Sequence, residues 1–187
     1  MIQSHEVDYI EDLGVLSGKP VKLIRTIGGL CIAAGIEPGK EREEALSTGS
    51  HPAIVRYSME KRFGSRFQPA MYKSEGMGEP VVRDHSKAIK GDLYKKGYSL
   101  HSVRNGNSIE LHLSKSGTPV FVHTAMAKGE EICMEPEARY INFTASKEAI
   151  SGGVVRSLTN ALYDIANQDG EKKLTFVSKS HIPSKEG

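Results

Sequence analysis

The chain has 187 residues, of which 38% are hydrophobic and 26% are charged, and its formal net charge at pH 7 is +2. These values are typical of a globular protein and exclude an intrinsically disordered chain. The most apolar segment, residues 27–36, is too short to cross a bilayer, so we predict no membrane partner.

The cysteine content indicates a reducing compartment. Cys31 and Cys133 are too few for a disulfide framework. Met1 and Ile2 are followed by the polar residues 3–6 rather than by the apolar stretch of a signal peptide. We therefore predict a cytoplasmic location, with delivery into another cell without a conventional signal as the alternative.

The first 50 residues carry the weakest pattern of the chain. Residues 21–25 are predicted to form a strand, and a Gly-Gly pair separates them from the apolar run 30–34. Residues 41–46 are predicted to form a short helix that ends in a polar loop. The role of this N-terminal part is therefore left open.

A firmer helix is predicted to begin at Pro52, which suits a first helical turn. Ser50 or His51 can cap its N-terminus, and Gly64 follows its last turn. Residues 65–80 contain two prolines and two glycines and are predicted to form a long loop.

Two further helices are predicted, each with an N-cap residue. Asp84 caps the first, over residues 85–96, and Ser151 caps the second, over residues 152–167. The apolar residues of the second recur at helical spacing and are expected to pack on the sheet: Val154, Val155, Leu158, Ala161, Leu162 and Ile165. A strand is predicted over residues 139–144.

Residues 97–124 have the pattern of a three-stranded antiparallel meander. Asn105-Gly106 is a strong signal for a two-residue hairpin turn, and Ser116-Gly117 is the second turn. Alternation along the strands predicts one core face, made of Tyr98, Leu100, Ile109, Leu111, Leu113, Val120 and Val122. It predicts a second face made of His101, Glu110, His112, Phe121 and His123.

These turns predict a row of ionisable residues across the second face. The first turn places His101 opposite Glu110, and the second places Glu110 opposite His123. His112 lies two residues along the same face. A slip of one residue in either hairpin would move a histidine to the core face and dissolve the row.

Three interpretations of the row compete. The first is a solvated sheet face with ordinary cross-strand charge pairing. The second is acid–base catalysis by Glu110, His123, His101 and His112, because a carboxylate beside an imidazole provides a base and an acid. This chemistry is similar to that of small microbial ribonucleases. The third is a metal site with Fe(II) or Zn²⁺.

A basic, aromatic-rich stretch indicates a phosphate-bearing partner. Residues 54–104 carry a net charge of +6, against −4 for the remainder, and hold six of the twelve aromatic residues. Basic groups interleaved with aromatic rings suit nucleic acid. The candidate nucleic-acid-binding residues are Arg56, Arg62, Arg66, Lys95, Arg104 and Lys115. Arg104 and Lys115 are also the candidate cations for a phosphodiester reaction at the row.

Together these patterns predict an α+β fold with an antiparallel meander sheet of at least four strands and helices packed on one face. We predict a single domain over residues 1–177 and a C-terminal tail over 178–187. The predicted function is binding or cleavage of RNA or another phosphodiester, without a cofactor. The alternatives are a non-catalytic protein-interaction module or secreted effector, and a small His/Glu metalloenzyme. The sequence does not indicate an oligomeric state.

Overall fold

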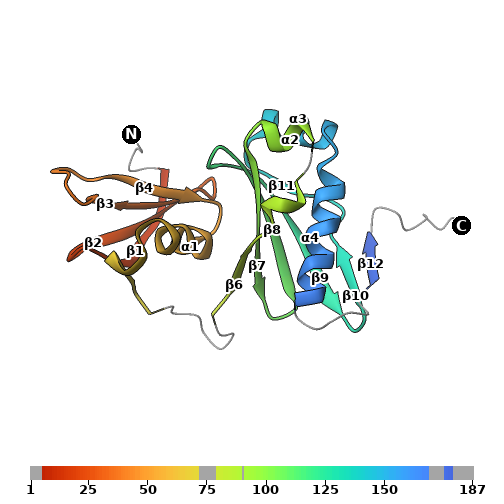
Figure 1. Ribbon diagram of the computed structural model, residues 1–187, viewed down its shortest axis with the longest axis horizontal. Helices are drawn as coiled ribbons and strands as arrows, with labels where there is room; N and C mark the ends of the chain where they lie inside the picture. The colour runs from red at the N-terminus through yellow and green to blue at the C-terminus, as the bar shows by residue number, and fades with distance from the viewer. Residues whose placement is uncertain (1–5, 72–78, 90, 169–174, 179–187) are drawn as a thin grey trace, which may run out of the picture. The chain divides into compact units, whose positions relative to one another are not determined.

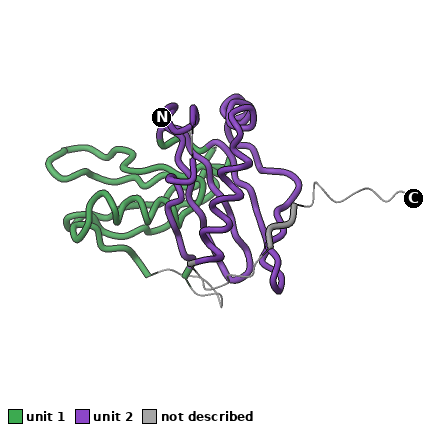
Figure 2. The backbone as a smooth tube through the Cα atoms, turned by 45° about the vertical axis from the view of Figure 1, so that its right-hand side comes forward, with its two compact units in different colours: residues 1–79, 117–119 green, residues 80–116, 120–187 purple. Residues whose placement is uncertain are grey.

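The computed structural model describes residues 6–71, 79–89, 91–168 and 175–178. The fold is α+β and is built on antiparallel sheets, as predicted. The chain divides into two compact units, residues 1–79 with 117–119 and residues 80–116 with 120–187 (Figure 2). Among the described residues, no helix is long and apolar enough to span a membrane.

The first unit is a five-stranded sheet with one helix. Its strand order is β4-β3-β2-β1-β5. Its elements are β1 (Val7–Leu16), β2 (Lys19–Thr26), β3 (Cys31–Gly35), β4 (Glu44–Gly49), α1 (Pro52–Phe63), a 3₁₀ helix (Gly64–Arg66) and β5 (Phe67–Pro69). The strand predicted over residues 21–25 is confirmed as part of β2.

Helix α1 begins and ends where the sequence predicts. The ring Nδ1 of His51 accepts a hydrogen bond from the Ala53 backbone N–H at 2.9 Å, and Pro52 opens the first turn. Gly64 follows the last turn with a φ of 56°. The helix buries Val55, Met59 and Phe63 against the sheet.

The helix predicted over residues 41–46 is wrong, because the second half of this segment belongs to β4. Leu46 is buried among the apolar residues of the sheet, and β4 pairs antiparallel with β3. Pairing with an existing strand satisfies the backbone of this segment and outweighs the helix propensity of its glutamates.

The second unit is a seven-stranded sheet with its helices packed on one face (Figure 1). The strand order is β12-β10-β9-β8-β7-β6, and β11 also pairs with β9. The strands are β6 (Val81–Asp84), β7 (Tyr98–Asn105), β8 (Ser108–Lys115), β9 (Thr118–Lys128), β10 (Glu131–Met134), β11 (Arg139–Tyr140) and β12 (Thr175–Ser178). The helices are a 3₁₀ helix (Ser86–Ala88), α2 (Asp92–Lys95), α3 (Phe143–Ser151) and α4 (Val154–Gln168).

The helix predicted over residues 85–96 is largely wrong. The segment before it is strand β6, which pairs with β7, and only a 3₁₀ turn and the four-residue α2 follow. Gly91 has a φ of 69°, outside the helical region, so a continuous helix cannot pass through it. The capping role of Asp84 survives, because its carboxylate accepts hydrogen bonds from the backbone and hydroxyl of Ser86.

The segment after the meander contains a helix that the sequence analysis missed. The strand predicted over residues 139–144 ends at Tyr140, and the Asn142 side chain then caps α3 by accepting from the Ala145 N–H. At the C-terminus, β12 pairs parallel with β10, and residues 179–187 of the predicted tail lie outside the described residues.

The apolar core of the second unit lies between the sheet and helix α4. Five of the six α4 positions predicted to face the sheet are at most 1% exposed: Val154, Leu158, Ala161, Leu162 and Ile165. Val155 is 57% exposed, so its predicted inward orientation is wrong. Consecutive residues of a helix point in different directions, so Val155 lies on the outer surface of α4 while Val154 faces the sheet.

A polar cluster joins α3 to the end of β7. The Glu148 carboxylate accepts hydrogen bonds from the Tyr98 hydroxyl and from Lys115 Nζ at 2.9 Å, and it pairs with Lys96 Nζ at 2.9 Å. The hydrogen bond from Tyr98 and then those from the two lysines lower the pKa of Glu148 to about 2.

The depressed pKa of Glu148 predicts that its carboxylate stabilises the fold at neutral pH and that this stabilisation is lost in acid. Because this pKa lies below its ordinary value, the contribution is present above about pH 4.5 and is lost as the pH falls toward 2. We expect Glu148→Gln to lower stability at neutral pH, and the gap to the parent to narrow between pH 4.5 and 2. Urea unfolding across this range checks it, with Glu130→Gln, in an exposed turn, as control. A gap that stays constant with pH would contradict the assignment.

Candidate functional site

The three strands of the predicted meander are confirmed, but the first turn is displaced. The loop residues are Gly106 and Asn107 rather than Asn105 and Gly106, because Asn105 pairs with Ser108. This moves the register by two residues. Side chains alternate with a period of two, so each keeps its predicted face but gains a different partner.

The new register brings two histidines together. His101 on β7 lies directly opposite His112 on β8, and Glu110 lies opposite Val103. The prediction that His101 faces Glu110 is therefore wrong, and Glu110 is its diagonal neighbour. On the other side, β6 places Asp84 directly opposite His101.

Two carboxylates flank the histidine pair. The Nε2–H of His112 donates to Glu110 Oε1 at 2.9 Å. Asp84 Oδ1 lies 3.9 Å from Nε2 of His101. We call these four residues, Asp84, His101, His112 and Glu110, the histidine row. All four belong to strands of the second unit.

The members of the histidine row differ in exposure. The side chain of His112 is 1% exposed, whereas those of His101, Glu110 and Asp84 are 20%, 34% and 50% exposed. Burial lowers the pKa of His101, the Asp84 carboxylate opposes this change, and His112 adds to the lowering. The accessible groups of the row are therefore a carboxylate on β8 and an imidazole on β7 beside a second carboxylate.

His123 on β9 contacts the backbone of Glu135. Its Nε2–H donates to the Glu135 carbonyl oxygen at 2.6 Å. Strand β9 is also irregular, because the consecutive residues Val120 and Phe121 both join the apolar core. The prediction that Phe121 lies on the face opposite the core is thus wrong. The position of His123 opposite Glu110 stays a prediction.

The two cations proposed to assist the row lie on the other face of the sheet. Arg104 pairs with Ile109, and Lys115 pairs with Tyr98, and both partners belong to the apolar core. Lys115 is also bound to Glu148. Neither residue can stabilise charge at the row, because directly paired residues share a face.

The remaining basic candidates are divided between the units. Lys95 lies on α2 of the second unit, whereas Arg56, Arg62 and Arg66 belong to α1 and the following 3₁₀ helix. Arg56 pairs with Glu79 at 2.9 Å, and Arg66 lies 5.7 Å from the Phe63 ring centroid.

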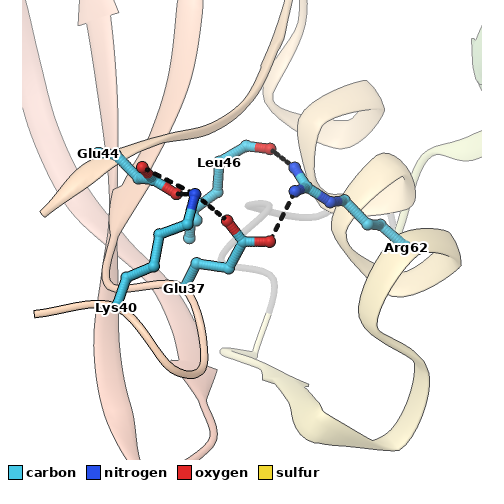
Figure 3. Close-up of polar contacts among 5 residues, drawn as sticks. All are labelled: Glu37, Lys40, Glu44, Leu46 and Arg62. Carbon is cyan, nitrogen blue, oxygen red and sulfur yellow. Dashed lines mark hydrogen bonds and ion pairs between the residues drawn. The ribbon is translucent and has the colours of Figure 1, made fainter.

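Arg62 has a structural role in the first unit (Figure 3). Its guanidinium donates to the Leu46 carbonyl oxygen at 2.7 Å and to Glu37 at 2.9 Å. Lys40 joins Glu37 at 3.0 Å and Glu44 at 3.1 Å, and its hydrogen bond lowers the pKa of Glu37. This cluster ties α1 to β4 and to the loop before it.

The structure assembles a second polar group that the sequence analysis missed. His85 Nε2 lies 2.8 Å from Ser102 Oγ, and His85 Nδ1 lies 3.7 Å from Asp164 Oδ2. The order of atoms is that of a Ser-His-Asp triad. Because Ser102 is only 1% exposed, its oxygen is closed to substrates, and we assign this group to holding α4 on the sheet.

No spacing in the sequence connects these three residues, because they come from a turn, a strand and a distant helix. Burial lowers the pKa of His85, and the Asp164 carboxylate opposes this change. Within the described residues, no three histidine, cysteine, aspartate or glutamate side chains are close enough to hold a metal ion. No protein-family model, curated protein or solved structure matches the chain.

Proposed function

We propose that the protein binds and cleaves RNA by acid–base catalysis at the histidine row, in a cytoplasmic setting. The observation that supports this proposal is the cross-strand pair of His101 and His112, flanked by Asp84 and Glu110. RNA carries its own nucleophile, the 2′-hydroxyl, so the protein needs only a base for that proton and an acid for the leaving oxygen.

The exposures assign a role to each residue. Glu110 is the more accessible member of its pair and is the general base, with His112 behind it as a positioning residue that donates to the carboxylate. His101 is the general acid. Asp84 stabilises the protonated form of His101 because its carboxylate raises the pKa of that imidazole.

The reaction balances without a cofactor. Glu110 takes the proton of the 2′-hydroxyl as the 2′-oxygen attacks the phosphorus. His101 gives a proton to the 5′-oxygen as the bond between phosphorus and this oxygen breaks. The products are a 2′,3′-cyclic phosphate and a free 5′-hydroxyl. Diagonal neighbours on one sheet face lie about 7–8 Å apart, which leaves room for a phosphodiester between Glu110 and His101.

The test is cleavage of matched RNA and DNA oligonucleotides. We expect cleavage of a fluorescent RNA oligonucleotide to a 2′,3′-cyclic phosphate, and no cleavage of the DNA version, which lacks the nucleophile. Equal cleavage of both strands, or a 5′-phosphate product, would overturn the mechanism. No cleavage of either strand would overturn the catalytic proposal.

The pH profile of kcat/KM tests the pairing of His101 with Asp84. A general acid works only while protonated, so activity falls as the pH rises through the pKa of His101, which burial places below its ordinary value. Asp84→Asn removes the charge that raises this pKa, so we expect the alkaline limb to move to lower pH. Ser86→Ala, which keeps the Asp84 carboxylate, is the control. An unchanged limb in Asp84→Asn would remove Asp84 from the mechanism.

A protein-interaction module is the second candidate function. The observation that favours it is the set of exposed apolar side chains on α3 and α4: Phe143, Ile150, Val155 and Tyr163. Under this alternative, variants of the histidine row would leave binding to the partner protein unchanged.

A further inference from the structure

An aromatic ladder runs from strand β9 to the surface of the second unit. The Phe121 and Tyr140 ring centroids lie 6.4 Å apart at 85°, and those of Tyr140 and Phe143 lie 6.0 Å apart at 78°. Such edge-to-face contacts are favourable and fix the orientation of each ring. The ladder begins in the core, where Phe121 is 2% exposed, and it ends on the first residue of α3.

The outer half of the ladder is open to solvent. Tyr140 is 46% exposed and Phe143 is 62% exposed, although both are large rings that a folded chain tends to cover. They are also held in place from behind, because Tyr140 pairs with Phe121 in the sheet. These rings are therefore rigid and exposed, which lowers the entropy that a ligand loses on stacking against them.

Cations accompany the two exposed rings. The Nζ of Lys147 lies 4.9 Å from the Phe143 ring centroid, and Arg139, beside Tyr140, is exposed. Glu148, the acidic neighbour of Lys147, is engaged by Tyr98 and two lysines in the polar cluster. Glu137 is the other exposed acidic residue near this segment.

We propose that Tyr140, Phe143 and Lys147 form a stacking platform for single-stranded nucleic acid. A base stacks on the Phe143 ring, and Lys147 pairs with a neighbouring phosphate. This inference rests on the proposed action on RNA and adds a binding surface on the core-bearing face of the sheet, because Tyr140 pairs with Phe121 of the apolar core. Exposed rings with flanking cations bind single strands with little sequence preference.

The charge on the platform favours a nucleic acid over a protein surface. A lysine beside an aromatic ring matches the two parts of a nucleotide, a flat base and an anionic phosphate. A purely apolar partner would have to desolvate this lysine without compensation.

Binding of a fluorescein-labelled twelve-residue oligothymidylate, measured by fluorescence anisotropy at low salt, tests the platform. This DNA probe lacks the 2′-hydroxyl, so cleavage cannot affect the result. We expect Phe143→Ala to weaken affinity about 5- to 150-fold, and Phe143→Trp to retain it. Lys147→Gln is expected to reduce the slope of log affinity against log salt by about 1.

Tyr163→Ala is the matched control, because Tyr163 is an exposed aromatic residue on α4, with 48% of its surface accessible. Equal losses in Phe143→Ala and Tyr163→Ala, or no loss in Phe143→Ala, would overturn the platform. Absence of probe binding by the parent chain would also overturn it. Probe binding that needs Phe143, combined with intact RNA, would retain the platform and reject the catalytic proposal. RNA cleavage that is insensitive to Phe143→Ala would retain the catalytic proposal and reject the platform.

Discussion

Glu110→Gln is expected to lower the rate of RNA cleavage by about two to four orders of magnitude, the usual contribution of a general base. The substitution keeps the shape of the side chain and its ability to accept from His112, but it removes the carboxylate that takes the 2′-hydroxyl proton. Glu110 is the only carboxylate on β7 and β8, and the other carboxylate of the row, Asp84 on β6, is paired with His101.

The measurement is single-turnover cleavage of an RNA oligonucleotide, with melting temperature recorded for each variant. Glu130→Gln, in the turn between β9 and β10, removes a carboxylate far along the chain and should keep the parent rate. Cleavage by Glu110→Gln within a few-fold of the parent would show that the row is a solvated sheet face. A normal melting temperature would separate lost chemistry from lost folding.

Leu162→Ala is expected to cost about 2–5 kcal/mol of unfolding free energy, because it leaves a cavity in the core beneath α4. Leu162 is 1% exposed and packs among the residues of the sheet core. Val155→Ala, on the same helix, should change stability by no more than about 0.5 kcal/mol, since its side chain is 57% exposed.

The two α4 variants form a matched pair, since both remove apolar carbons from one helix. Urea denaturation of each variant, followed by circular dichroism, gives the difference directly. Similar losses for the two would mean that α4 presents a different side to the sheet. This comparison decides between the structure and the sequence-based pattern, which places both residues inward.

Residue patterns predicted the sheet faces of the second unit better than its register. The segment Asn105-Gly106-Asn107 contains two adjacent candidate turns, Asn-Gly and Gly-Asn, and both suit two-residue hairpins. Gly106 has a φ of 62°, and the described non-glycine residues with positive φ are Ser17 and Ser116, not Asn107. A type II′ turn, with glycine first, therefore replaces the predicted type I′ turn.

The remaining errors arise where tertiary contacts override local preference. The glutamate-rich segment ending at Leu46 pairs with β3 although it resembles a helix locally, and the helix predicted over residues 85–96 is interrupted at Gly91, which has a positive φ. The group formed by Ser102, His85 and Asp164 depends on the packing of α4, which no local pattern encodes. His101, His112 and Glu110 of the histidine row were predicted on one face, but the pairing of His101 with His112 and the place of Asp84 beside them were not.

Strand β12 has a consequence for the order in which the second unit is completed. It pairs parallel with β10 through Thr175–Ser178, so the sheet edge at β10 stays open until these late residues emerge during synthesis. An open edge presents unpaired N–H and C=O groups to any other strand nearby. The edge of β10 is therefore exposed until Thr175–Ser178 pair with it, after which β12 is the edge strand of the sheet.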